Sequence, residues 1–334
     1  MADALPALLI AAAATFAATP LCRALALRLG VVDRPGGRKQ HGEPVPMLGG
    51  LAVFCGLLAL WAYRPGLLTS PLLVAVAGTL LVGVWDDLHD LKTHIKVGWQ
   101  VLVVVVAVIA LGSHLPHITG VLAVDATLSG LFLLGSMNLI NFADTYDGLC
   151  VLSVAGIASV MAVSAMPVSD LHWGVVGACL GFLPWNQRHR YRIFLGDGGS
   201  LMLGLIVGYL ALHTPAAALA TDAAYPPAWV IPLLIMGIPI LDGATVTLHR
   251  YLAGRPVTVG ARDHLSHRLA AAGVRPSAMV PLLAGLTAGF ASLGPIYAEL
   301  GSGFGALVLT AAMTLWTAGL VLALRCPIYG GSRR

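Results

Sequence analysis

Three carboxylates lie within five residues at the end of one long apolar run, at Asp86, Asp87 and Asp90. No cation precedes them within that run, so the charge that balances them must come from elsewhere. On a helix, Asp86 and Asp90 are one turn apart and Asp87 and Asp90 are three residues apart, so all three crowd one sector and repel one another. The cluster therefore favours a bound cation. A solvated helix end is the alternative, but carboxylates at a membrane end indicate a functional site by default.

The composition is that of an integral membrane protein, because 58% of the 334 residues are apolar and only 10% are charged. We expect an all-α, polytopic fold that forms a single transmembrane domain over residues 1–334, without an appended soluble domain. The cysteines are scattered in or beside apolar runs without paired spacing, which argues against a disulfide framework and against a zinc site. They are Cys22, Cys55, Cys150, Cys179 and Cys326.

Eleven segments are long and apolar enough to be candidate membrane spans, since a span needs about 20 apolar residues to cross a hydrocarbon core of ~30 Å. We expect the active site to lie in the loops that join them on the cytoplasmic side. The segments cover residues 5–28, 47–63, 67–85, 97–112, 127–142, 149–166, 171–185, 200–214, 226–248, 278–297 and 303–324.

The distribution of charge supports this count of spans. If the spans alternate, one side of the membrane receives nearly all of the 19 Lys and Arg residues, and only Arg64 falls on the other side. The positive-inside rule makes the basic side cytoplasmic, so we predict an outer N-terminus, an inner C-terminus and a retained first span. The clustered carboxylates fall on the basic side too, a mixture that suits an anionic substrate bridged by a metal ion.

The first inner loop combines helix-breaking prolines and glycines with cations, among them Lys39, that could meet a phosphate group. A basic loop that only sets topology is the alternative. At the start of the next span, Gly49 and Gly50 would allow another helix or a lipid to approach closely.

Amide and carboxylate side chains recur at every third position around residue 140, at Asn138, Asn141, Asp144 and Asp147. Three residues rotate a helix by about 300°, so one straight helix would place the first and last of them on opposite sides. We therefore expect the helix to break near Asp144, with all four side chains facing one mouth. Helix capping would explain one or two of these residues, but hardly four.

A glycine-rich turn at residues 196–200 opens a later helix and carries Asp197. Backbone amides at a helix start suit an anion, and an aspartate with little steric cover suits a metal ion. An ordinary N-cap at Asp197 is the alternative. Upstream, Arg188, Arg190 and Arg192 are explained by topology alone.

The longest inner loop carries two histidines, His264 and His267, that would share one helical face. They could hydrogen-bond one phosphate group together with Arg268, or bind a metal ion together with Asp263. A purely structural role is the alternative. Asp242 is an intramembrane carboxylate near the inner end of the ninth span, and hydrogen bonding to a neighbouring helix is the alternative to a functional role.

Taken in order, these motifs resemble those of the polyprenyl-phosphate N-acetylhexosamine-1-phosphate transferases, within glycosyltransferase family 4. The closest resemblance is to the branch of undecaprenyl-phosphate GlcNAc-1-phosphate transferases. Each motif alone is weak, but their joint occurrence in this order between Arg38 and Arg268 is specific. The motifs are Pro-x-Leu-Gly-Gly, Asp-Asp-x-x-Asp, Asn-x-x-Asn-x-x-Asp-x-x-Asp-Gly-Leu, Gly-Asp-x-Gly-Ser and a histidine-rich last loop.

The resemblance implies an enzyme that transfers a sugar 1-phosphate from a UDP-sugar to undecaprenyl phosphate and releases UMP. It implies Mg²⁺, with Mn²⁺ as an alternative, and a multi-pass enzyme of the bacterial inner membrane whose active site faces the cytoplasm. Its partners would be the two substrates and the lipid bilayer. A homodimer is suggested, and no nucleic acid is expected.

The same resemblance assigns roles to individual residues. Asp197 and Asp87 would bind the metal ion, and Asp86, Asp87 and Asp90 would form the catalytic trio. Asp86 would activate the lipid phosphate, by taking its proton or by direct attack. Basic groups of the first and last inner loops, with magnesium, would balance the carboxylates. The substrate-binding residues would be Lys39, Asn138, Asn141, Asp144, Asp147, His264, His267 and Arg268.

The sequence departs from the family pattern at several places. Thr145 stands where many relatives have Gly, Ser266 where a His is common, and Arg190-Tyr191 where a Pro-Ala pair is usual. Without the three consecutive histidines of the peptidoglycan branch, the chain is closer to the branch that starts O-antigen, teichoic acid or other surface polysaccharides. A proton- or cation-coupled transporter is the alternative function, and a catalytically silent scaffold is a third.

Overall fold

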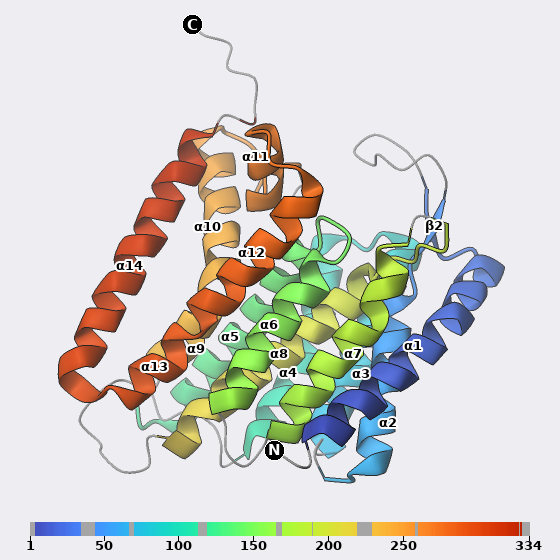
Figure 1. Ribbon diagram of the computed structural model, residues 1–334, viewed down its shortest axis with the longest axis horizontal. Coiled ribbons are helices and arrows are strands. Elements are labelled where there is room, and N and C mark those ends of the chain that lie inside the picture. Colours follow the sequence, from blue (N-terminus) through green and yellow to red (C-terminus); the bar gives the residue numbers. More distant parts are fainter. Residues whose placement is uncertain are drawn as a thin grey trace, which may run out of the picture.

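The computed structural model describes residues 4–34, 44–66, 70–112, 119–164, 169–188, 190–218, 229–257, 260–326 and 328. Most of these residues are helical, as the composition predicts, and the helices run roughly side by side (Figure 1). The helices are α1 (Ala4–Leu29), α2 (Gly49–Tyr63), α3 (Ser70–His89), α4 (Thr93–Leu111), α5 (Leu122–Ala143), α6 (Leu149–Ser164), α7 (Ser169–Asn186), α8 (Gly196–Ala218), α9 (Val230–Ile235), α10 (Gly237–Leu252), α11 (Leu265–Ala271), α12 (Pro276–Ala291), α13 (Leu293–Glu299) and α14 (Gly301–Arg325).

Six helical stretches in the described part of the chain are long and apolar enough to cross a membrane. They lie in α1, α3, α4, α5, the pair α12 and α13, and α14, while α2 and α6 are shorter apolar helices. Side chains such as Leu307, Leu315 and Leu322 of α14 are exposed, which fits contact with lipid rather than water. The chain is therefore a multi-pass membrane protein. Each of the eleven predicted segments overlaps one helix or two consecutive helices, and their number as spans stays a prediction.

Helix α8 lies at the centre of the bundle. Residues 198–212 are all buried, and α8 packs against α2, α3, α5 and α6. Helix α1 packs on α2 and α7 at one edge, whereas α14 packs on α10 and α13 at the opposite edge (Figure 1). Because α8 begins at Gly196, this packing fixes the position of Asp197 at one end of the bundle.

The helical path breaks at two places where the chain turns. Helix α5 ends at Ala143, which confirms the predicted break near Asp144. Helices α9 and α10 meet at Met236, where Pro239 has no N–H to offer the carbonyl of Ile235. Helix α10 then leads to α11, which lies at the same end of the molecule as the turn after α5 (Figure 1).

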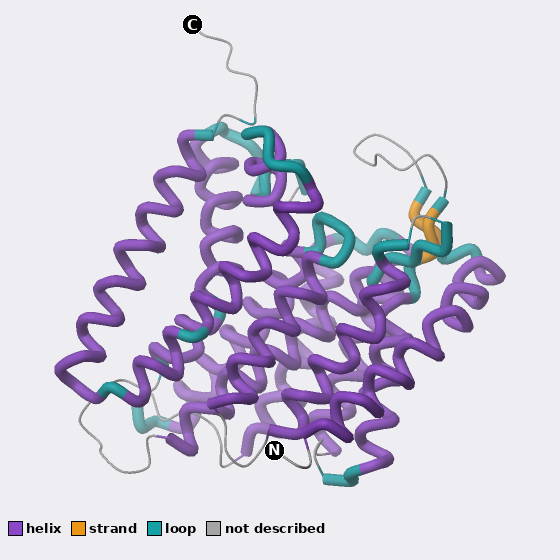
Figure 2. Tube along the Cα trace, viewed as in Figure 1, coloured by secondary structure: helices purple, strands orange, loops and turns teal. Residues whose placement is uncertain are grey.

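A short hairpin stands beside the end of α1 (Figure 2). Strands β1 (Val32–Asp33) and β2 (Val45–Pro46) pair antiparallel, with Val32 opposite Pro46. The chain then bonds to the segment before α8. The carbonyl of Pro46 accepts the amide of Phe194 at 2.8 Å, and the amide of Gly50 donates to the carbonyl of Leu195 at 2.8 Å. The hairpin therefore holds the glycine-rich turn against the start of α2.

The one cation on the opposite side of the predicted topology has a partner. Arg64, which follows α2, forms an ion pair with Asp170 in the first turn of α7. The only exception to the charge asymmetry is therefore neutralised within the protein.

Candidate active site

Asp86 and Asp87 occupy the last turn of α3, but Asp90 does not belong to that helix. Helix α3 ends at His89, and Asp90 has a φ of 50° and an exposed side chain. The amide of Asp90 donates to the carbonyl of Asp86 at 2.8 Å, and the amide of Leu91 donates to Asp86 Oδ1 at 2.9 Å. The prediction that three carboxylates crowd one helical sector is therefore wrong, because the backbone turns away before the third.

Lys96 is a cation that balances the carboxylates, and it was not among the residues predicted for the site. From the first turn of α4, its Nζ donates to Asp86 Oδ2 at 2.7 Å and also to Asp197 Oδ2. A balancing basic group thus comes from the helix that follows α3, a source that the sequence did not predict. A signal was present, because Lys96 is the single Lys, Arg, Asp or Glu of α4.

The N-terminus of α8 binds a carboxylate, and that carboxylate belongs to the same chain. The amide of Asp197 donates to Asp87 Oδ1 at 3.0 Å, after Gly196 turns the backbone at a φ of 74°. A helix start offers unpaired amides and a favourable dipole to an anion. The other oxygen, Asp87 Oδ2, is buried without a hydrogen-bond partner among the described residues.

Glycines bring these carboxylates together. A Cβ atom on Gly83 of α3 would overlap the backbone of Gly198, and one on Gly50 of α2 would overlap the backbone of Gly199. The backbones of α2 and α3 therefore touch the start of α8 directly. The expected close approach at Gly49 and Gly50 is confirmed: Gly50 meets the glycine-rich turn, and Gly49 meets the ring of Phe182 and the carbonyl of Phe194.

The two asparagines of α5 face different partners. Asn141 Nδ2 donates to Asp197 Oδ1 at 3.0 Å and to Ser200 Oγ at 2.9 Å, so Asn141 joins the carboxylate site. Asn138, about one turn earlier, donates to Gln100 Oε1 at 3.0 Å and fastens α5 to α4. Of the two, Asn141 is the one that contacts a site carboxylate.

The turn after α5 holds Asp144 and Asp147 near the same site. The side chain of Asp144 reaches solvent, but many protein atoms surround its carboxyl group. The resulting loss of hydration, together with the negative charges of Asp197 and Asp147, raises the pKa of Asp144 to about 7. Asp147 Oδ2 pairs with Arg192 Nε at 3.2 Å. Arg192 therefore neutralises a site carboxylate, beyond any role in topology.

Asn186, at the end of α7, fixes the position of this turn. Its Oδ1 accepts the amide of Gly148 at 2.5 Å, and its Nδ2 donates to the carbonyl of Ile193 at 3.0 Å. The turn after α5 and the segment before α8 are therefore held at a defined separation. Nothing in its sequence neighbourhood marked Asn186 as a site-building residue.

Asp242 orients the histidine loop. Its Oδ2 lies 2.8 Å from His264 Nδ1, and its Oδ1 accepts the amide of Leu265 at 2.6 Å, at the first turn of α11. The alternative role expected for Asp242, hydrogen bonding to a neighbouring element, is the one observed. The ring of His264 lies 5.7 Å from that of Phe142 in α5. The histidine loop thus packs on the helix that carries Asn141.

His267 contacts the turn after α5. Its ring lies 5.2 Å from the ring of Tyr146. Burial lowers its pKa, and the nearby His264 and Arg262 lower it further. A neutral imidazole at pH 7 follows, which can offer one hydrogen bond to a substrate without adding charge.

Asp263 and Arg268 stabilise the histidine loop through buried hydrogen bonds. Asp263 is fully buried, and both of its oxygens accept hydrogen bonds from Arg250, at 2.7 and 2.8 Å. The buried guanidinium of Arg268 donates to the carbonyls of Asp263 at 2.8 Å and Ala323 at 2.7 Å. Arg268 therefore fastens α11 to the end of α14, and the structure does not bring it to a substrate position. The alternative of Asp263 as a metal ligand is not supported, because Asp263 is fully buried and both of its oxygens pair with the buried guanidinium of Arg250.

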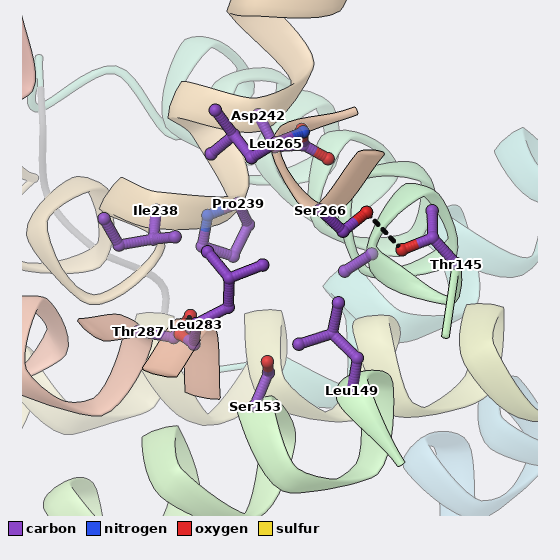
Figure 3. A pocket seen from close by; sticks show the side chains of 11 residues that line it. Thr145, Leu149, Ser153, Ile238, Pro239, Asp242, Leu265, Ser266, Leu283 and Thr287 are labelled. Carbon is purple, nitrogen blue, oxygen red and sulfur yellow. Dashed lines mark hydrogen bonds between the residues drawn. The ribbon is translucent and has the colours of Figure 1, made fainter. Parts of the chain in front are cut away.

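Two of the departures from the family pattern contact each other. Thr145 Oγ1 and Ser266 Oγ lie 2.7 Å apart, which links the turn after α5 to α11 at the edge of a small recess (Figure 3). Leu149, Leu283 and Pro239 form apolar walls of this recess. The two substitutions thus form one joint between the two predicted substrate-binding loops.

Lys39 lies outside the described residues. Over the residues with described positions, no three His, Cys, Asp or Glu side chains converge closely enough to hold a metal ion by themselves. Asp86, Asp87, Lys96, Asn141 and Asp197 nevertheless form one connected polar set at the bundle end.

The fold and this polar set define a class: a multi-pass membrane protein with a charged site at one end of its helical bundle. The profile of glycosyl transferase family 4 matches residues 70–214, the segment that supplies every member of the set. A cation-coupled transporter gains no support, because its carboxylates would lie near the middle of the bilayer in broken helices, whereas these lie at helix ends.

Sequence similarity to proteins of known name identifies the family of this chain. The chain is 33% identical over 288 residues to a probable undecaprenyl-phosphate N-acetylglucosaminyl 1-phosphate transferase of Bacillus subtilis, a match that covers 80% of this chain and 78% of the relative. It is 33% identical over 304 residues to a decaprenyl-phosphate N-acetylglucosaminephosphotransferase of Mycolicibacterium smegmatis, covering 78% and 74%. An Escherichia coli undecaprenyl-phosphate alpha-N-acetylglucosaminyl 1-phosphate transferase is 28% identical over 295 residues. The chain therefore belongs to glycosyl transferase family 4, as its motifs predicted.

Proposed function

We propose that this enzyme transfers an N-acetylhexosamine 1-phosphate from a UDP-sugar, such as UDP-GlcNAc, to undecaprenyl phosphate and releases UMP. The relatives are named for transfer of N-acetylglucosamine phosphate to undecaprenyl or decaprenyl phosphate. The observation that carries the proposal is the joint contact of Lys96 with Asp86 and Asp197, beside the unpaired buried oxygen of Asp87. Phosphoryl transfer depends mainly on positioning and charge neutralisation, which such a set supplies.

Magnesium, or manganese in its place, fits this set. Mg²⁺ commonly takes one or two carboxylates and completes its coordination with water and substrate phosphates, so three converging protein ligands are not required. Asp87 Oδ2 is buried without a partner among the described residues, and Asp197 is hydrogen-bonded to the same carboxyl group. We assign Asp87 and Asp197 to hold the ion. When bound, it would neutralise charge on the diphosphate and on the transferred group.

Asp86 is assigned to activate the acceptor. In a one-step route it takes the proton of the lipid phosphate, whose oxygen then bonds to the sugar-bearing phosphorus as the bond to the UMP oxygen breaks. In a two-step route the carboxylate attacks that phosphorus first as the bond to the UMP oxygen breaks and UMP leaves, and an oxygen of the lipid phosphate then displaces the carboxylate from the phosphorus. Lys96 holds Asp86 in place in both routes and offers positive charge to the phosphates.

The two loops joined by Thr145 and Ser266 are assigned to the donor. Asn141, Asp144 and Asp147 would face the nucleotide, and neutral His267 with His264 would donate hydrogen bonds to the diphosphate. Asn138 would position Asn141 through its place on α5, and Asp90 would add charge at the exposed rim. Lys39 stays assigned to a phosphate group. Arg268 would keep the histidine loop in place through its carbonyl contacts.

We further infer that the site faces the cytoplasm at the inner membrane, where UDP-sugars are made, and that the product starts a cell-surface polysaccharide. The basic loops lie at the same end of the chain's alternating spans as the site. A homodimer, suggested by the family resemblance, belongs to the same proposal.

The test is UMP release by the purified enzyme with undecaprenyl phosphate and a panel of UDP-sugars. Wild-type protein should release UMP only with lipid and metal, EDTA should stop release, and added Mg²⁺ should restore it. Asp87→Asn and Asp197→Asn should each lower the rate by about 10³-fold or more. Glu299→Gln removes an exposed carboxylate at the junction of α13 and α14 and should leave the rate unchanged. No UMP from any donor with intact lipid acceptor would contradict the proposal.

A further inference from the structure

A cluster of arginines and aromatic rings lies away from the carboxylate set, between the end of α1 and the segment that follows α7. The guanidinium of Arg188 lies 5.2 Å from the ring centre of Trp185. Those of Arg23 and Arg190 each lie 5.8 Å from the ring centre of Tyr191. Three positive charges are therefore gathered around two rings.

Four of these side chains, all but that of Arg190, line a recess, and a hydrogen bond fixes part of its wall. Pro20 sits inside α1 and has no N–H, so the carbonyl of Phe16 loses its helical donor. Trp185 Nε1 supplies that donor at 3.1 Å, and the rings of Phe16 and Trp185 lie 5.2 Å apart. The indole is thereby fixed in position. The recess holds about 300 Å³, and its lining includes Pro20, Arg23, Trp185, Arg188 and Tyr191.

The charges that line the recess favour an anionic ligand. Among the described residues its lining contains no carboxylate, and α1 has none along its described length. The Nε–H of Arg23 is shielded from solvent and has no acceptor among the described residues. A buried guanidinium donor without an acceptor is costly, and a phosphate oxygen would satisfy it with a charge-assisted hydrogen bond.

The surroundings indicate which anion. Leu21 and Leu25 flank Arg23 on α1 and are 72% and 40% exposed, which in a membrane span means contact with lipid chains. Arginine and aromatic side chains at a span end match the level of lipid headgroups. The residue after Tyr191, Arg192, pairs with Asp147 of the active site and not with the recess. The recess is thus lipid-facing on one side and joined to the active site through its own loop.

We propose that this recess binds the phosphate of an anionic phospholipid headgroup, with Arg23 and Arg188 as the phosphate ligands and Tyr191 and Trp185 as the walls. An occupied recess would hold the segment at residues 190–195 against α1. That segment carries Arg192 and leads into the glycine-rich turn of the active site. The inference concerns lipid binding and does not depend on the proposed transfer reaction.

The experiment measures lipid binding to the purified, full-length protein in neutral detergent, by native mass spectrometry and by thermal unfolding. Phosphatidylglycerol should bind and raise the unfolding temperature, whereas phosphatidylcholine with the same acyl chains should not. Each of Arg23→Gln and Arg188→Gln should weaken phosphatidylglycerol binding roughly fivefold. Arg275→Gln removes an exposed arginine at the start of α12, outside the recess, and should bind lipid as the wild type does.

Two further measurements distinguish the phospholipid from other phosphate-containing ligands. Inorganic phosphate at equal concentration should not compete, and full competition by it would overturn the lipid assignment in favour of a free anion. If undecaprenyl phosphate binds the arginine variants as it binds the wild type, the recess is separate from the acceptor site. If the variants lose undecaprenyl phosphate binding as much as they lose phosphatidylglycerol binding, that separation is overturned. Equal lipid binding by the wild type and a folded Arg23→Gln, Arg188→Gln double variant would overturn the proposal, whatever the result of the UMP assay.

Discussion

At the scale of single residues, Lys96 explains how adjacent carboxylates persist at the end of an apolar helix. Two like charges close together are unfavourable unless a cation or a proton compensates them. Lys96 has hydrogen bonds to Asp86 and to Asp197 and is itself mostly shielded, with 17% of its side chain exposed. It therefore serves as a fixed positive charge among carboxylates that arrive from two different helices.

Replacing Lys96 should damage catalysis more than folding. Lys96→Gln keeps a hydrogen-bond donor but removes the charge, so we expect kcat for UMP release to fall about 10²-fold. Lys96→Arg keeps the charge but changes its shape, and we expect partial activity between the two. Rates measured at saturating UDP-sugar and lipid, beside unfolding temperatures, separate catalysis from stability. A Lys96→Gln enzyme with wild-type kcat would remove Lys96 from the mechanism.

At the scale of elements, the site depends on direct contact between helix backbones. Helices α3 and α8 meet at Gly83 and Gly198, one turn from Asp86 and next to Asp197. A close approach of this kind needs residues without a Cβ. The charged side chains are therefore held in place by glycines that carry no chemistry of their own.

Gly83→Ala tests this contact. The added methyl group would overlap backbone atoms of Asp197 and Gly198, which cannot move aside as a side chain could. We expect a loss of about 1–3 kcal/mol in the free energy of unfolding, and a lower rate of UMP release because the carboxylates separate. Gly135→Ala on α5 has open space around its Cβ position and serves as the matched control. Equal behaviour of the two variants would contradict the role given to the contact.

At the scale of the whole molecule, the helical segments could be predicted because hydropathy is a local property of the chain. The break at Asp144 followed from spacing alone. The identity of the balancing cation could not be predicted, because Lys96 reaches Asp197 only through the packing of α3, α4 and α8. The same holds for Arg268, because one of its carbonyl partners, Ala323, lies on α14, far along the chain. Sequence motifs identify residues that can do chemistry, whereas tertiary packing determines which charged side chains contact one another.

The orientation in the membrane is a further property of the whole chain, and it can be tested directly. Only one of the 19 Lys and Arg residues lies on the predicted outer side, and this residue, Arg64, is paired with Asp170. This bias of Lys and Arg toward one side predicts a cytoplasmic C-terminus. In intact spheroplasts, a C-terminal epitope tag should resist added protease and an N-terminal tag should be cleaved, while lysis should expose both. Cleavage of the C-terminal tag in intact spheroplasts would reverse the orientation and place the carboxylate site outside, where UDP-sugars are absent.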